Sequence, residues 1–160
     1  MPNEIKGDLQ GQGLQIAIVV SHFNGFVTRS LFQGAQEGLQ EHGVRDDDVT
    51  VAWVPGSLEL AIIAKALAQT QRYDAVVCLG AVIRGETTHY DHVASETASG
   101  ISRASMETGV PVIFGVLTTE NIEQAINRAG GKSGNKGYDV ALAAIRMGRL
   151  MRKLKESRSD

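Results

Sequence analysis

Residues 75–91 read AVVCLGAVIRGETTHYD, and this stretch decides the fold. Its first part, residues 75–82, is an unbroken apolar run, which predicts a strand that is buried on both faces. A polar turn follows over residues 83–89, and a helical pattern begins near Tyr90. A buried strand that leads through a polar turn into a helix is the repeating unit of open α/β sheets, which bind ligands at such turns.

The same alternation of strand and helix extends over the whole chain. We expect further strands over residues 16–20, 49–54 and 112–117, and helices over residues 24–41, 57–69, 90–107, 122–129 and 138–154. Strands rich in Val and Ile that alternate with helices predict a four-stranded parallel sheet with helices on both faces, a three-layer αβα sandwich. No linker or repeat interrupts the pattern, so we expect one domain over residues 1–160 with an extended N-terminal arm over residues 1–13.

The composition limits the class of protein. Of the 160 residues, 42% are hydrophobic and 21% are charged, which is ordinary for a globular domain, and the net charge of −2 gives no general attraction to nucleic acid. The one cysteine, Cys78, cannot form an internal disulfide, which favours a reducing compartment. No apolar run reaches the roughly 18 residues of a membrane span, and the polar N-terminus does not read as a secretory signal. We therefore expect a cytoplasmic protein with no membrane or nucleic-acid partner.

Two predicted helices are too apolar for an isolated domain. Nine of the twelve residues 57–68 are apolar, and apolar residues of the last helix recur at spacings of four and three, at positions 140, 144, 147, 151 and 154. A helix that is apolar on several sides is buried on several sides. Other parts of the same domain could cover these helices, and contact between subunits is the alternative.

The turn after the third strand combines an anion site with a proton carrier. Backbone N–H groups in the first turn of a helix lack partners within the helix and favour anions, and the hydroxyls of Thr87 and Thr88 lie beside them in the sequence. His89 follows, and histidine exchanges a proton most easily near neutral pH. This combination indicates chemistry on a phosphorylated substrate, whereas a solvated loop histidine is the simpler alternative.

Two other strand ends carry candidate binding residues. Phe23 and Asn24 follow the first strand, where they could stack on a planar ring and hydrogen-bond to it, and Ser57 and Glu59 follow the second strand, where they could bind hydroxyls. Each residue has a structural alternative. Asn24 and Ser57 could cap helices, Phe23 could belong to the core, and Glu59 gains about 0.3–1 kcal/mol from the helix dipole without any ligand.

Basic residues gather in two places near the C-terminus. Residues 128–137 hold three basic residues and four glycines between two predicted helices, a composition suited to phosphate. A flexible connection with solvated charges is the alternative. The basic residues from Arg146 onward are predicted to form a solvated helix end that suits the negative C-terminal dipole.

Five of these segments together resemble the lumazine synthase family. They are SHFN at 21–24, VPGSLE at 54–59, GAVIRGETTHYD at 80–91, VIFGVLTTE at 112–120, and the segment 123–137. The resemblance extends from about Gly13 to Leu150. It implies a flavodoxin-like fold and the condensation of 5-amino-6-ribitylaminouracil with 3,4-dihydroxy-2-butanone 4-phosphate, which releases 6,7-dimethyl-8-ribityllumazine, phosphate and water. Family members need no metal and no organic cofactor.

The resemblance also implies roles for individual residues. By this resemblance His89 donates a proton and Phe23 stacks on the pyrimidine ring. Arg128, supplied by an adjacent subunit, binds the phosphate of the substrate. It further implies that Ser57, Leu58 and Glu59 contact the ribityl chain and ring, and that Ala81, Val82 and Ile83 contact the pyrimidine. Glu86 and Thr87 match positions that contact the phosphorylated ketose. Phe114 matches a pyrimidine-site residue that an adjacent subunit supplies, and Lys136 matches a basic residue near the site.

Assembly and partners follow from the same resemblance. Family members form pentamers, and some build a hollow icosahedral shell of twelve pentamers; the short turn at residues 130–137 resembles the shell-forming members. The resemblance also suggests riboflavin synthase as a partner. Two other functions stay open on the same fold: a flavin-binding module without catalysis, and a structural shell protein. A hydrolase would need a paired base and nucleophile, and no such pair stands out.

Overall fold

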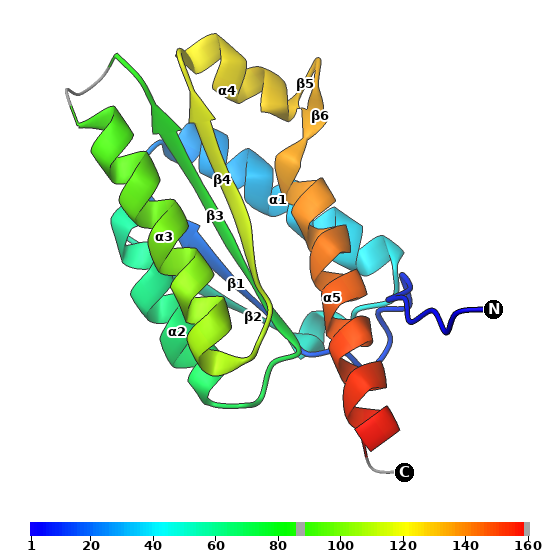
Figure 1. The fold of residues 1–160 in the computed structure, drawn as a ribbon. Helices are drawn as coiled ribbons and strands as arrows, with labels where there is room; N and C mark the ends of the chain where they lie inside the picture. Colours follow the sequence, from blue (N-terminus) through cyan, green and yellow to red (C-terminus); the bar gives the residue numbers. More distant parts are fainter. Residues whose placement is uncertain (86–88, 159–160) are drawn as a thin grey trace.

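A parallel sheet between two helical layers forms the domain in a computed structural model, which describes residues 1–85 and 89–158. The sheet has the strand order β2-β1-β3-β4, with β1 at Ile16–Ser21, β2 at Val49–Val54, β3 at Ala75–Ile83 and β4 at Val112–Thr119. Helices α1 (Gly25–Glu41) and α5 (Lys136–Arg158) cover one face, and α2 (Leu60–Gln69) and α3 (Tyr90–Thr108) cover the other (Figure 1). The predicted flavodoxin-like αβα sandwich is confirmed.

Alternate residues of the inner strands supply two cores. Ile16, Ile18 and Val20 pack with α1 and α5, whereas Ala17 and Val19 pack with α2 and α3. All nine residues of β3 are buried, because β3 lies between β1 and β4 and both of its faces are covered. This double burial explains the unbroken apolar run at residues 75–82, since a strand with one solvated face would alternate apolar and polar residues.

The strand order creates a switch point beside β1. The chain leaves β1 for α1 on one face of the sheet and leaves the adjacent β3 for α3 on the other face (Figure 1). Connections that diverge to opposite faces leave a crevice at the carboxyl ends of the two strands, which is where open α/β sheets bind ligands. The fold therefore places the carboxyl ends of β1 and β3 at one crevice.

The glycine-rich segment forms a hairpin instead of the flexible connection that was the alternative to a phosphate site. It follows α4 (Ile122–Arg128) and forms a small antiparallel hairpin of β5 (Ala129–Gly131) and β6 (Gly134–Asn135). Asn135 then caps α5, since its Oδ1 accepts the N–H groups of Gly137 at 2.8 Å and Tyr138 at 3.2 Å. Its Nδ2 donates to the carbonyl of Ser30 at 3.0 Å, which ties the hairpin to α1.

The basic end of α5 is not simply solvated, contrary to the sequence prediction. Arg149 donates to the carbonyls of Gln10 and Gln12, and Lys153 donates to the carbonyl of Lys6 at 2.6 Å. These side chains therefore hold the N-terminal segment against α5, near which the N-terminus lies in Figure 1. The helix end binds backbone carbonyls that lie more than 130 residues earlier in the chain.

An ion pair also fastens α5 to the base of the sheet. Arg152 contacts Asp74 through two parallel bonds, Nε to Oδ1 at 2.7 Å and Nη2 to Oδ2 at 2.9 Å. The backbone N–H of Gln15 donates to the same carboxylate at 2.7 Å. The hydrogen bond to Asp74 raises the pKa of Arg152. Asp74 thus joins the starts of β1 and β3 to the C-terminal helix.

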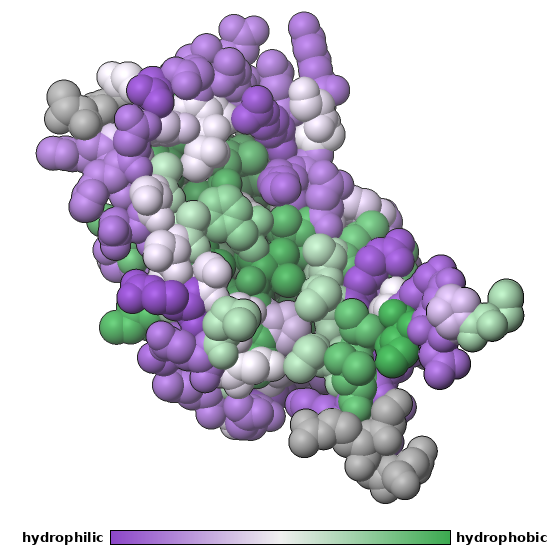
Figure 2. Space-filling view, viewed as in Figure 1, coloured by the Kyte–Doolittle hydropathy of each residue, from purple (hydrophilic) through white to green (hydrophobic). Residues whose placement is uncertain are grey.

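Apolar surface remains on the outside of the domain. In α2 only Leu60, Ala64 and Ala68 are buried, and Ile62 is 69% exposed. Hydrophobic residues also gather over the edge strand β4, between α3 and α5 (Figure 2). Among the described residues, α3 packs along α2 but leaves its outer face, which carries Ile62, exposed. Within residues 1–85 and 89–158, none of the helices has both the length and the apolar character needed to span a bilayer.

Candidate functional site

A small cavity lies at the switch point and collects residues from three strand ends. Its volume is about 80 Å³. The loop after β1, the short 3₁₀ helix after β2 (Ser57–Glu59), the end of β3 and the first turn of α3 contribute its lining. The lining residues are Phe23, Asn24, Ser57, Ala81, Val82, Ile83, Tyr90 and Val93. Five of the substrate-binding positions expected from the sequence therefore meet in one place.

The position of Ser57, which lines the cavity, depends on a glycine in β3. A Cβ atom at Gly80 would lie 2.7 Å from Ser57 Oγ, 3.1 Å from Leu60 Cδ1 and 3.3 Å from Ser21 Oγ. Only a residue without a side chain lets the Ser57 hydroxyl lie this close to the strand. Ser57 is 8% exposed, so its hydroxyl is held at a largely buried position against the sheet.

Asn24 is a structural tie rather than a helix cap. Its backbone is left-handed, with φ 58° and ψ 43°, and its side chain makes no capping hydrogen bond to α1. Instead Nδ2 donates to the carbonyl of Ala81 at 3.0 Å. Asparagine tolerates left-handed geometry better than most residues, which explains its presence at this turn. The cap interpretation is therefore wrong, and Asn24 links the turn after β1 to the end of β3.

Phe23 presents its ring to solvent at the mouth of the cavity. The side chain is 59% exposed, so the alternative that it belongs to the core is wrong. Its backbone is nevertheless fixed, because its N–H donates to the carbonyl of Pro55 at 3.0 Å and the N–H of His22 donates to that of Val54 at 2.7 Å. An exposed aromatic ring on a fixed backbone is suited to stacking on a planar ligand.

The first turn of α3 forms another side of the cavity. His89 is exposed and lies immediately before α3, and its carbonyl accepts the N–H of Val93 at 2.9 Å. Tyr90 and Val93 line the cavity, and the sequence analysis missed both. Their spacing of three could have indicated them, since residues three apart share a helix face and this helix begins right after the predicted site. The predicted contacts Glu86 and Thr87 lie outside the described residues.

Several predicted site residues do not reach this cavity. Phe114 lies in the middle of β4, opposite Cys78, and is half-buried. Arg128 ends α4 and Lys136 begins α5, and both are exposed. Leu58 is 49% exposed and faces the groove between α2 and α3 instead.

Glu59 also lies outside the cavity lining. Its Oε1 accepts the N–H of Gly56 at 3.0 Å, which orders the start of the 3₁₀ helix. This contact favours a structural role for Glu59, because the carboxylate satisfies a backbone donor at a helix N-terminus without any ligand. The side chain of Glu59 is exposed, however, so it remains accessible to solvent at the end of the 3₁₀ helix.

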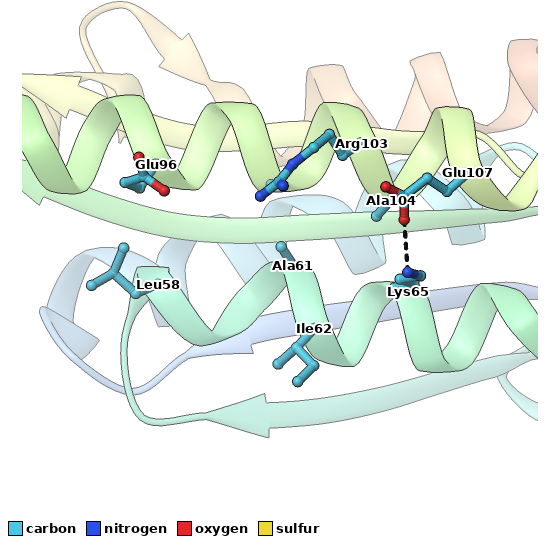
Figure 3. Close-up of a pocket in the computed structure, with 9 residues that line it drawn as sticks. Leu58, Ala61, Ile62, Lys65, Glu96, Arg103, Ala104 and Glu107 are labelled. Atoms are coloured by element: carbon cyan, nitrogen blue, oxygen red, sulfur yellow. Dashed lines mark ion pairs between the residues drawn. The ribbon is translucent and has the colours of Figure 1, made fainter.

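A larger groove of about 380 Å³ runs between α2 and α3 (Figure 3). Apolar side chains such as Ile62 line it together with charged ones, and Lys65 Nζ pairs with Glu107 Oε2 at 2.7 Å across it. The groove lies on the outer flank of the helical layer and has no strand end in its lining. The smaller cavity is the better candidate for chemistry, because it lies at the carboxyl ends of the strands.

The fold and its topology define a doubly wound α/β protein with a small cavity at its switch point. The comparison with known families narrows this class. A family model described as 6,7-dimethyl-8-ribityllumazine synthase matches residues 13–152, and the chain belongs to this family. Membership supports a role as an enzyme of riboflavin biosynthesis.

Proposed function

We propose that the protein condenses 5-amino-6-ribitylaminouracil with 3,4-dihydroxy-2-butanone 4-phosphate to form 6,7-dimethyl-8-ribityllumazine. The observation that carries this proposal is the cavity at the switch point. It brings Phe23, Ser57 and the end of β3 together. The family resemblance matches all three positions to contacts with the pyrimidine substrate. Three separate sequence motifs thus line one cavity, which supports the proposal that they act on the same substrate.

The geometry supports a binding mode for the pyrimidine. Its ring stacks on the exposed side of Phe23, and backbone groups at the end of β3 bind its polar edge. Ser57 supplies a hydroxyl from the adjacent turn, within the same cavity lining. Because these groups are fixed by the sheet before the substrate arrives, little ordering is needed on binding, and two held substrates react as if highly concentrated.

The proposed reaction requires proton transfers at each condensation. The amine attacks the ketone and forms an imine with loss of water, phosphate then leaves, and ring closure expels a second water. We assign the proton donor to His89, which is exposed and adjacent to the cavity-lining Tyr90. A positioned general acid contributes about 10²–10⁴ in rate, so His89→Ala slows turnover without abolishing it. Arg128→Ala impairs the reaction most when the phosphorylated ketose is limiting.

We further propose that the active form is a homo-oligomer, a pentamer that assembles into an icosahedral shell. The cavity at the switch point of one chain measures about 80 Å³, whereas sites for ligands of this size usually exceed about 300 Å³. Phe114 and Arg128 lie away from this cavity, which supports their supply by a neighbouring chain. The exposed apolar face of α2 and the apolar surface over β4 supply surfaces for such contacts.

Two measurements test this proposal. Absorbance detects lumazine formation when both substrates are mixed with size-fractionated protein, and light scattering gives the mass of the active fraction. Product formation supports the enzyme, whereas flavin binding without product would favour the non-catalytic module. A mass near that of five chains would restrict the assembly to the lone pentamer.

A further inference from the structure

Arg84 makes an unusual set of contacts at the end of β3. Its guanidinium pairs with two carboxylates, Nη2 with Asp91 Oδ1 at 2.9 Å and Nε with Glu120 Oε2 at 3.0 Å. The same group lies over the ring of Tyr90, with Cζ 4.6 Å from the ring centroid. Its backbone N–H donates to the carbonyl of Thr119 at 2.8 Å. One residue therefore joins the end of β3, the first turn of α3 and the turn after β4.

Only arginine can make these contacts together. The guanidinium is planar and carries its donors in a fixed fork, so it can pair with two carboxylates in its plane and stack on an aromatic ring with its face. Lysine has the same charge but no plane and no fork. An isolated exposed ion pair contributes little to stability, and Arg84 is 47% exposed, so the value of this group lies in the geometry that it fixes.

The contacts of Arg84 converge on the side of the cavity formed by α3. Tyr90, which Arg84 covers, lines the cavity, and His89 precedes it in the chain. We propose that Arg84 is a positioning residue, which clamps the first turn of α3 to the sheet and so fixes His89 and Tyr90 relative to the substrates. The link to turnover rests on the proposed function, whereas the clamp itself can be measured without substrates.

The clamp is tested by amide hydrogen exchange of the full-length protein. Val93 N–H, bonded to the carbonyl of His89 at 2.9 Å, reports on the first turn of α3. In Arg84→Gln we expect the Val93 N–H to exchange about 10-fold faster than in wild type. Its exchange rate in Arg84→Lys should lie between those of Arg84→Gln and wild type. Arg45→Gln is the matched control, because Arg45 also forms an exposed pair, with Asp47 at 3.4 Å, but lies beyond the end of α1.

Steady-state kinetics with the two substrates test the consequence. Misplacement by about 1 Å can cost about 10²-fold, so we expect Arg84→Gln to lower kcat about 10-fold to 100-fold with little change in KM for the pyrimidine. The thermal midpoint and the oligomer mass should match those of the Arg45→Gln control. Glu120→Gln should lower kcat less, and adding it to Arg84→Gln should cause no further loss.

Distinct results separate the two ideas. Unchanged exchange at Val93 in Arg84→Gln overturns the clamp, and so does full recovery of kcat in Arg84→Lys, because charge alone would then suffice. Faster exchange with wild-type kcat, or lost activity with a changed oligomer mass, overturns the positioning role. Faster exchange in a protein whose wild type forms no lumazine supports the clamp and contradicts the proposed function instead.

Discussion

Adding one methyl group at Gly80 should disturb both the stability and the site. The new Cβ would lie 2.7 Å from Ser57 Oγ and 3.1 Å from Leu60 Cδ1, so these side chains must move. Overpacking of this kind costs about 1–3 kcal/mol, and the reduced freedom of the unfolded chain returns about 0.4–1 kcal/mol. We expect Gly80→Ala to lower the free energy of unfolding by about 1–2 kcal/mol and to raise KM for the pyrimidine substrate.

A second substitution tests whether this mechanism is correct. Ser57→Ala removes the atom closest to the new methyl group, so the double variant should recover at least half of the lost stability when compared with Ser57→Ala alone. Urea unfolding at one fixed protein concentration measures both effects, since unfolding of an oligomer depends on concentration. Gly56→Ala is the control, because its Cβ would meet only Glu59 Oε1 at 3.3 Å. A fully stable Gly80→Ala, or a double variant without recovery, would refute the reasoning.

Three further predictions concern single side chains. Phe23→Ala should change the free energy of unfolding by less than about 0.5 kcal/mol, because the ring is 59% exposed, yet weaken pyrimidine binding by about 1–3 kcal/mol in calorimetric titration; equal binding would contradict the stacking role. Asp74→Asn should lower the free energy of unfolding in urea by about 1–3 kcal/mol, since Arg152 and the N–H of Gln15 lose a charged acceptor. An unchanged free energy of unfolding would show that other contacts hold α5 to the sheet. Burial raises the pKa of Cys78 from 9.0 to about 12, so stability is fully present below pH 9 and falls as pH rises toward 12, by up to about 1.4 kcal/mol per pH unit. Unfolding curves at several alkaline pH values should show stability falling more steeply in wild type than in Cys78→Ala, and this difference is the contribution of the thiol.

The strands and helices could be predicted from the sequence because local patterns determine them. The apolar run at 75–82 has no polar member, and only a doubly covered strand buries such a run. The hairpin after α4 was missed, because its glycines resemble those of a loop and its pairing covers only a few residues. The contacts of Arg149 and Lys153 were missed because their acceptors are backbone carbonyls, which have no sequence signature.

The candidate site was predictable where its residues follow strands. Phe23, Ser57 and the end of β3 meet in one cavity because parallel strands bring their carboxyl ends to the same edge. The role of Asn24 was not predictable, since a polar residue before a helix is usually a cap and only the left-handed backbone redirects its side chain to Ala81. The prediction that Phe114 acts in the site stays a prediction, because that residue lies in the middle of β4.

The most direct test of the proposed activity is the absorbance assay for 6,7-dimethyl-8-ribityllumazine, run in parallel on wild type and His89→Ala. Both proteins should first show the same thermal midpoint and the same oligomer mass, so that any difference belongs to the chemistry. We predict product formation by wild type and turnover about 10²–10⁴ lower in His89→Ala. No product from wild type with both substrates present would contradict the proposed reaction, and equal turnover would contradict the role of His89.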